Sequence, residues 1–249
     1  MINPMDLSGK HILITGGSAG IGRTAAIQAS KLGAKISLVA RSEDKLKETI
    51  GLLEGDGHSF YIYDLNDTEG IQDLVKDIVL KDGPLDGLVH AAGIGLIRPV
   101  KLTKPDFLMD NLKIHFLAFS ELIRAASARK NSNEGASYLG ISSVASLHGN
   151  KTQGAYSAAK SAMNAVVHPY AKELAAKNIR VNTIAFGMVE TDMYKGFLES
   201  GGNNEELLRE QYLGVIPVDY AGNAICYMLS DAAKFITGST FIYDGGALS

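Results

Sequence analysis

The chain has 249 residues, 46% of them hydrophobic and 20% charged, which is enough to bury the core of one α/β domain spanning residues 1–249. Its net charge of −3 and its scattered Lys and Arg residues give no reason to expect a nucleic-acid partner or an anionic membrane surface. Cys226 stands alone, the histidines lack metal-ligand spacing, and no apolar run could span a bilayer, so we expect a cytoplasmic protein without disulfide or metal.

Short β-branched runs alternate with longer helical stretches along the chain. The pattern predicts strands at 11–15, 35–40, 59–63, 85–90, 137–142, 180–185 and 240–243. It predicts helices at 21–32, 42–53, 68–80, 106–128, 155–176 and 222–229. This alternation indicates a single Rossmann-type, doubly wound parallel sheet with helices on both faces. Its ligand should lie outside the carboxyl ends of the strands, where the strand order reverses.

Two of the predicted helices are apolar on more than one side. The stretch 107–126 carries apolar residues beyond a single stripe, and the helix after Tyr156 is similarly broad. Such helices are buried on two faces, against their own sheet and against a second body. A second subunit is the natural cover, and extra loops of the same chain are the alternative.

A glycine-rich turn directly follows the first predicted strand, from Thr15 to Gly22. Such a turn lets the backbone approach a pyrophosphate, and the next helix offers free N–H groups and the positive end of its dipole. The position of the turn at the first strand–helix junction favours nucleotide binding over a simple chain reversal. The predicted nucleotide contacts here are Gly16, Ser18, Gly20, Ile21 and Gly22.

The end of the second predicted strand bears on which nucleotide is bound. An acidic residue there would favour NAD, but the chain has Arg41, which can pair with a 2′-phosphate. Ala19 supplies no second cation from the glycine turn, so NADP(H) is favoured and NAD(H) stays possible. Asp64 and Leu65 follow the third strand and are predicted to contact the adenine, with helix capping as the competing role of Asp64.

Tyr156 and Lys160 lie four residues apart at the start of a predicted helix, on one face. Reduction of a carbonyl needs a proton donor for the developing alkoxide while hydride reaches the carbon. A nearby ammonium lowers the pKa of a tyrosine from about 10 towards the working pH. A core tyrosine beside a snorkelling lysine is the alternative that the pair alone would allow.

With these surroundings the chain resembles the short-chain dehydrogenase/reductase family, from Gly9 to Gly246. The resemblance rests on several motifs in order: 15–22, 90–93, 111–113, Ser143, Tyr156 with Lys160, 179–182, 185–187 with Thr191, 236–238 and 244–246. It departs from the family pattern at His90, where Asn is usual, and at Phe186, where Pro is usual.

The resemblance implies a catalytic set of Asn111, Ser143, Tyr156 and Lys160. Tyr156 would donate the proton, and Ser143 would hydrogen-bond the substrate oxygen. Lys160 would bind the nicotinamide ribose and lower the tyrosine pKa, while Asn111 would hold a water that links Lys160 to solvent. Further cofactor contacts are implied at Ala92, Gly93, Gly187, Val189 and Thr191, beside Tyr156 and Lys160.

Within the family, residues 149–155 and 190–193 are similar to those of 3-oxoacyl-acyl-carrier-protein reductases. That similarity implies a β-keto thioester substrate on an acidic carrier protein, with Arg124, Arg129 and Lys130 as candidate docking cations. Residues 194–214 are expected to form a substrate lid.

Two alternatives to this substrate stay open. One is a reductase or dehydrogenase of a sugar or another small ketone, and the other is a non-catalytic cofactor-binding scaffold or sensor. From the two broad apolar helices and the family's habit of pairing such helices, we expect a homotetramer.

Overall fold

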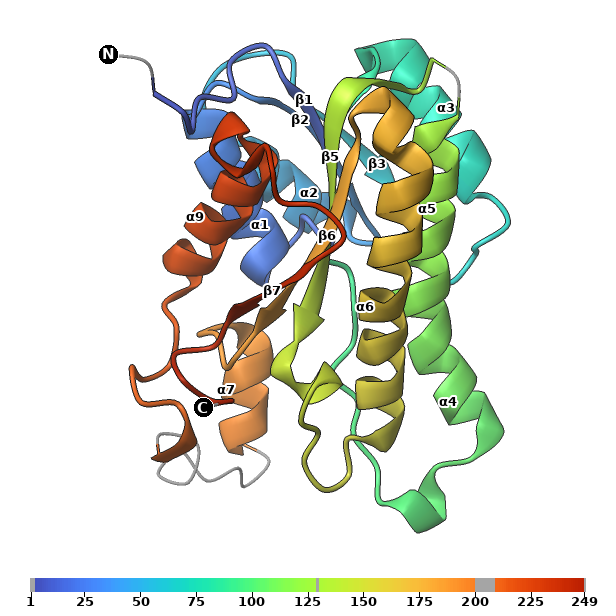
Figure 1. The fold of residues 1–249 in the computed structure, drawn as a ribbon, viewed down its shortest axis with the longest axis vertical. Helices are drawn as coiled ribbons and strands as arrows, with labels where there is room; N and C mark the ends of the chain where they lie inside the picture. Colours follow the sequence, from blue (N-terminus) through green and yellow to red (C-terminus); the bar gives the residue numbers. More distant parts are fainter. Residues whose placement is uncertain (1–2, 129, 200–208, 249) are drawn as a thin grey trace.

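The computed structural model describes residues 3–128, 130–199 and 209–248. In this part of the chain, one sheet of parallel strands has the order β3-β2-β1-β4-β5-β6-β7 (Figure 1). The strands are β1 (His11–Thr15), β2 (Lys35–Ala40), β3 (Ser59–Ile62), β4 (Leu85–His90), β5 (Ser132–Ser143), β6 (Arg180–Phe186) and β7 (Thr240–Tyr243). The predicted doubly wound α/β sheet is therefore confirmed.

Helices cover both faces of this sheet, as Figure 1 shows. They are α1 (Gly20–Lys31), α2 (Glu43–Ile50), α3 (Ile71–Asp82), α4 (Pro105–Leu112), α5 (Ala118–Ser127), α6 (Gly154–Leu174), α7 (Asp192–Glu199) and α9 (Val218–Leu229). A π-helical segment, η2 (Lys113–Leu117), joins α4 to α5. Short 3₁₀ turns are η1 (Val100–Leu102), η3 (Val144–Ser146), η4 (Ala175–Lys177) and η5 (Asp231–Ala233). No helix of the described residues has the length and apolar character needed to cross a membrane.

The hydrophobic core has one half on each face of the sheet. Ile12 packs with α1 and α9 on one face, whereas its neighbour Leu13 packs with α3, α5 and α6 on the other. Successive side chains of a strand point to opposite faces, so a strand covered on both sides must be apolar at consecutive positions. This is why the strands read as continuous apolar runs in the sequence.

Strand bounds agree closely with the sequence-based prediction, except at β5. That strand begins at Ser132, five residues before the predicted start, because Ser132 pairs with Leu85 ahead of a register shift between Leu85 and Gly87. The irregular pairing hides the first residues of β5 from a simple alternation pattern.

The predicted long helix at 106–128 is confirmed in extent, from 105 to 127, but it is not regular throughout. The structure has α4, the π-helical segment η2 and then α5. Ala118 N donates to Lys113 O, five residues earlier, and the Ile114 carbonyl accepts from the ring of His90 at 3.0 Å. A side chain of β4 therefore hydrogen-bonds a carbonyl group of this helix. Such π-helical bulges occur frequently at functional sites.

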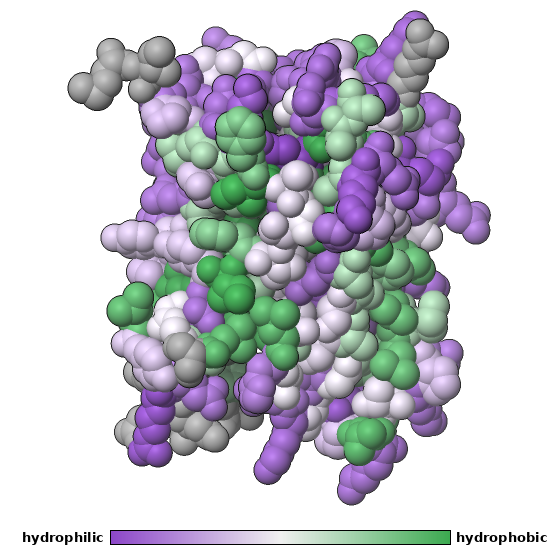
Figure 2. Space-filling view, viewed as in Figure 1, coloured by the Kyte–Doolittle hydropathy of each residue, from purple (hydrophilic) through white to green (hydrophobic). Residues whose placement is uncertain are grey.

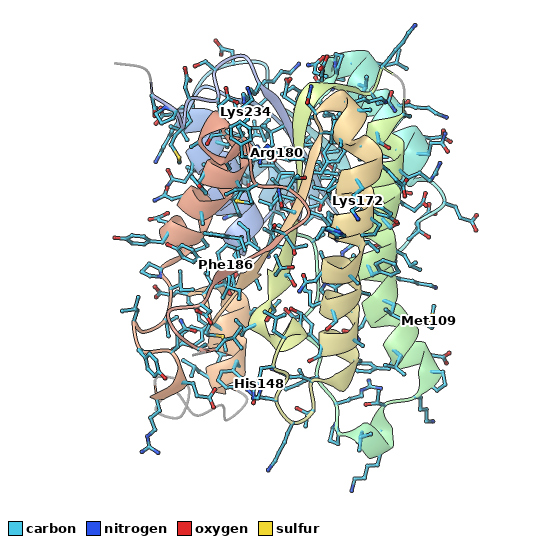
Figure 3. All side chains as sticks on the ribbon, in the orientation of Figure 1. Met109, His148, Lys172, Arg180, Phe186 and Lys234 are labelled. Atoms are coloured by element: carbon cyan, nitrogen blue, oxygen red, sulfur yellow. The ribbon has the colours of Figure 1, made fainter. Side chains whose placement is uncertain are left out.

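The strand order reverses between β1 and β4, so a crevice is expected at their carboxyl ends. Figure 3 gives the direction, because Arg180 opens β6 near the top of the view and Phe186 closes it lower down. The carboxyl edge of the sheet is the lower one, where α7 and the exposed loop with His148 lie.

Candidate active site

A cleft of about 770 Å³ opens at this carboxyl edge, over β1, β2 and β4. Most of the predicted cofactor contacts line it: Gly16, Ser18, Gly20, Ile21, Gly22, Arg41, Asp64, Leu65, Ala92, Gly93 and Thr191. Four other predicted contacts are not among its lining residues: Tyr156, Lys160, Gly187 and Val189. Residues that are far apart in the sequence thus meet at the predicted switch point of the sheet.

The glycine turn needs its glycines for two separate reasons. Gly16 has φ +70°, and a Cβ there would lie 2.6 Å from the backbone nitrogen of Ala92. Gly22 packs against the carbonyl of Gly16, where a side chain would collide. Helix α1 starts at Gly20 without a side-chain cap or an acid in its first turn, so its N–H groups and dipole are left to an anion in the cleft.

Two cations line the part of the cleft beyond β2. Arg41 follows the strand, and Lys45 lies four residues later, in the first turn of α2. Both side chains are exposed. Lys45 was missed by the sequence analysis, which looked for a second cation only in the glycine turn; its helical spacing from Arg41 was the available signal.

Asp64 has a local role that differs from helix capping. Its Oδ1 accepts from the backbone N and the side-chain Nδ2 of Asn66, at 3.0 and 2.9 Å, and α3 begins only at Ile71. Asp64 therefore stabilises a turn at the cleft wall. Leu65 beside it is 4% exposed and belongs to the core as well as to the cleft.

The four predicted catalytic residues come from three elements. Ser143 ends β5, Tyr156 and Lys160 occupy the first two turns of α6, and Asn111 lies near the end of α4. Lys160 Nζ lies 5.7 Å from the centre of the Tyr156 ring. Asn111 Nδ2 donates to Phe107 O at 2.9 Å, which leaves its buried Oδ1 without a partner among the described residues.

Burial dominates the electrostatics of this group. It lowers the pKa of Lys160 to about 7, and Lys160 Nζ donates to Ile141 O at 2.6 Å. Burial also raises the pKa of Tyr156, and a hydrogen bond with Ser143 acts in the opposite direction. In this arrangement burial outweighs the Ser143 hydrogen bond, so the pKa of Tyr156 lies above its usual value and not below it.

His90, at the position where the resemblance has an asparagine, joins neighbouring elements through both ring nitrogens. Its Nε2 donates to Ile114 O at 3.0 Å, and its Nδ1 accepts from Thr15 Oγ1 at 2.9 Å. The ring thereby ties β4 to β1 and to η2. Burial lowers the pKa of His90 to about 3, so the ring is neutral.

Gln211, which the sequence analysis missed, anchors the segment that follows β6. Gln211 Oε1 accepts from Met188 N at 2.8 Å, and its Nε2 donates to Met188 O at 3.1 Å. A Cβ at Gly187 would lie 2.5 Å from Gln211 Oε1, so glycine is required for this approach. Nothing in the sequence signals Gln211, because it lies 23 residues from Met188.

Gly187 and Val189 lie outside the cleft lining, in the segment that leads from β6 to Thr191. Val189 is buried and forms a β-bridge with Ile216. Thr191 follows at the start of α7, with Oγ1 accepting from Tyr194 N at 3.4 Å, and its methyl group faces Gly20 across the cleft. Phe186 is buried at the end of β6 against Tyr243, so it lies in the core and not in the loop over the cleft.

The predicted lid at 194–214 is described only in part. Residues 194–199 belong to α7, residues 200–208 lie outside the described chain, and Gln211 anchors the last part of the segment to Met188. The lid stays a prediction.

A second histidine that the sequence analysis missed lies against the tyrosine. The His115 ring meets the Tyr156 ring edge-on, with centroids 5.4 Å apart and planes at 84°. His115 is 1% exposed, and a side chain at Gly93 would collide with it. The spacing of four residues from Asn111 was the available signal, but only the π-helical segment turns the ring towards α6.

Known proteins are similar to this chain over nearly its whole length. A family described as enoyl-(acyl carrier protein) reductase matches residues 16–247. A 3-oxoacyl-[acyl-carrier-protein] reductase FabG of Rickettsia conorii is 32% identical over 250 residues, covering 98% of this chain and 99% of that protein. Carbonyl reductase family member 4 of Danio rerio is 32% identical over 236 residues, covering 94% of this chain and 96% of that protein.

Solved structures agree with the sequence relatives. A dehydrogenase/reductase from Sinorhizobium meliloti superposes with a TM-score of 0.90 at 26% identity, covering 99% of this chain and 98% of that one. A blue fluorescent protein from a metagenomic library, solved in complex with NADPH, has a TM-score of 0.89 at 25% identity and covers 98% of this chain and 100% of that one.

Proposed function

The chain belongs to the short-chain dehydrogenase/reductase family of oxidoreductases, and we propose that it uses NADPH to reduce a carbonyl group to a secondary alcohol. The observation that carries the proposal is the meeting of Ser143, Tyr156 and Lys160 at the same sheet edge as the glycine turn. A proton donor, an oxygen-binding hydroxyl and a cation then surround one place.

The four residues divide the proton chemistry between them. The raised pKa of Tyr156 keeps its phenol protonated near neutrality, which is the form that can give a proton to the substrate oxygen. Ser143 can hydrogen-bond the same oxygen. Lys160 and the water expected at Asn111 return a proton to the phenolate from solvent.

The cleft suits a dinucleotide. When bound, NADPH supplies the hydride. The uncapped start of α1 and the close backbone approach at Gly16 fit a pyrophosphate, and Arg41 with Lys45 fits a 2′-phosphate. The absence of a carboxylate at the end of β2 supports NADPH over NADH. The relative solved with NADPH agrees with this choice.

For the substrate we propose a β-keto thioester. The support is the likeness to 3-oxoacyl reductases and the half-exposed apolar side chains of Leu96, Leu147 and Met193, in segments at the carboxyl edge, which suit an acyl chain. The cations first considered for carrier docking do not flank this chain's own cleft. Lys130 and Arg124 precede β5, at the edge opposite Ser143, and Arg129 lies outside the described residues.

Two other functions are separable by experiment. A sugar or small-ketone reductase would use the same four residues with a different substrate. A scaffold or sensor would bind the nucleotide without turnover, and it would have no need of a buried lysine beside a tyrosine and a serine.

The test is NADPH oxidation with acetoacetyl thioester, free and carried on acyl carrier protein. Y156F is compared with Y170F, which removes a hydroxyl from the same helix where it only bonds Ser120, at 2.7 Å. We expect Y156F to lose at least about a hundredfold in kcat, because the proton donor is gone, while Y170F keeps the activity. A 2-enoyl thioester is the third substrate, because the matched family carries an enoyl reductase description.

Each result has a separate meaning. Turnover of the ketone alone supports the proposal. Turnover of only the enoyl thioester replaces it with double-bond reduction. Tight NADPH binding without turnover of thioesters, sugars or ketones favours the scaffold, and equal loss in both Tyr→Phe variants contradicts the role of Tyr156.

We further propose a homotetramer. Figure 2 shows hydrophobic residues on the α9–β7 side and on the α4–α5 side of the view. Phe235 is 95% exposed and Ile242 of the edge strand β7 is about half exposed, while Met109 on α4 is also exposed. Exposed apolar side chains on two sides can be covered by two kinds of contact with further copies.

A further inference from the structure

His115 is held by one nitrogen only. Its Nε2 lies 3.0 Å from Ile94 O and 3.5 Å from Ile94 N; the shorter contact, to an oxygen that can only accept, favours a hydrogen on Nε2 and leaves Nδ1 as an acceptor. Nδ1 is buried and has no partner among the described residues. His90, the other buried imidazole of the site, has both nitrogens bonded. A buried acceptor without a donor costs about 1–3 kcal/mol, so a donor is expected at His115 Nδ1.

A second orphaned acceptor lies one helical turn earlier. The Nδ2 group of Asn111 faces the carbonyl of Phe107, which fixes the orientation of the amide and leaves Oδ1 unpartnered. Both acceptors belong to the continuous segment α4–η2, which packs against α6. The orientation of Asn111 is set within α4, and that of His115 by the π-helical segment that follows it.

Lys160 provides the matching donor. Its ammonium has three N–H groups, and one of them is used on Ile141 O. Lys160 Nζ and the His115 ring both lie against the Tyr156 ring, 5.7 Å and 5.4 Å from its centre, which places the two groups in the same buried site. A water that accepts from Lys160 and donates to Asn111 Oδ1 and His115 Nδ1 would satisfy all three groups, and buried waters typically make about three hydrogen bonds.

We propose that His115 is a positioning residue of the proton relay: its Nδ1 accepts a hydrogen bond from a buried water that is also bound by Lys160. The inference rests on the proposed function, in which Tyr156 becomes a phenolate on giving its proton. A proton from solvent, passed through this water and Lys160, restores the phenol. His115 stays neutral and acts by holding the water, with His90 on β4 and Tyr156 and Lys160 on α6 as its titratable neighbours.

Two variants separate the effect of the Nδ1 acceptor from the effect of the aromatic ring. H115F keeps an aromatic ring against Tyr156 but has no acceptor, whereas H115N loses the ring but keeps an acceptor at the δ position. Without the acceptor the water stabilises charged Lys160 less, so the Tyr156 phenolate is less favoured. We expect H115F to lose about tenfold in kcat. Its pH profile for alcohol oxidation should move to higher pH by about one unit. KM and NADPH affinity should stay near wild type, and H115N should restore the profile.

If H115F keeps the wild-type pH profile and H115N loses it, His115 acts only through the packing of its ring, and the proposal is overturned. A second readout needs no turnover: a high-resolution crystal structure of the wild type should hold a water about 2.7–3.2 Å from His115 Nδ1. A protein donor at that nitrogen, or an apolar contact instead of the water, would also overturn it. If the wild type turns over no substrate while this water is present, the proposed function fails and the His115 contact stands.

Discussion

The ammonium nitrogen of Lys160 donates to the backbone oxygen of Ile141 at 2.6 Å, from a side chain that is only 5% exposed. The strand that ends in Ser143 therefore also orients the lysine of the next helix. One β5–α6 unit carries three of the four catalytic candidates, so their relative positions depend on how α6 packs against the sheet.

The burial of Lys160 should make the free energy of unfolding depend on pH. Burial lowers its pKa to about 7 in the folded chain, against about 10.4 in an unfolded one. Between these values the unfolded state binds more protons, so this contribution to the free energy of unfolding rises with pH, by at most about 1.4 kcal/mol per unit. Urea unfolding of wild type and K160M should show their difference moving in favour of wild type from about pH 7 to 9. A constant difference would mean that Lys160 stays charged when folded.

Nucleotide preference should depend on both cations of the cleft. R41A and K45A should each raise KM for NADPH about tenfold, the effect of one charged hydrogen bond, and leave KM for NADH nearly unchanged. K47A is the matched control, because Lys47 lies on the same helix, pairs with Glu43 at 2.7 Å and does not line the cleft. Equal changes for both nucleotides would place the cations away from the 2′-phosphate.

The close contact of Gly93 with His115 can be measured as a coupling. A Cβ at residue 93 would lie 2.8 Å from His115 Nδ1, so G93A should destabilise the fold by about 1–3 kcal/mol. In an H115A background the same change should cost much less, because the colliding ring is gone. Denaturant titration of the four proteins in this cycle gives the coupling, and additive effects would refute the contact.

Gln211 should hold in place the segment that precedes Thr191. Q211L keeps the volume but leaves the backbone N of Met188 unpaired, at a cost of about 1–3 kcal/mol, while Met188 O keeps its bond from Ile216 N. We expect a lower Tm and weaker NADPH binding, since Met188 leads into the cleft wall. Q72L is the control, because the Gln72 amide oxygen accepts a hydrogen bond only from Arg124 among the described residues, at 3.1 Å. Unchanged NADPH affinity in Q211L would show that this anchor is structural alone.

The assembly can be checked by light scattering. The particle mass should be four times the 26.5 kDa of one chain. F235E should lower this mass at micromolar protein, because it puts a charge on an exposed side chain near β7 that the proposed tetramer would cover. L80E, at an equally exposed leucine on α3, should not change it. A wild-type mass of one chain would remove the tetramer.

The sequence by itself determined the element types and the place of the cleft. Strand positions followed from β-branched runs, and the glycine turn with the Tyr156–Lys160 spacing predicted the two halves of the candidate site. These signals are local: a turn that needs positive φ at Gly16, or two side chains one helical turn apart, is encoded within a few neighbouring residues.

Only the tertiary structure decided the features that join distant segments. The break of the predicted helix 106–128 into a π-helical segment accompanies a hydrogen bond from His90, and that break turns His115 against Tyr156. The Gln211–Met188 anchor and the depth at which Lys160 is buried likewise depend on elements far apart in the chain. A periodic pattern records which side of an element faces the core, but which atoms meet there, and with what pKa, is set by packing between elements.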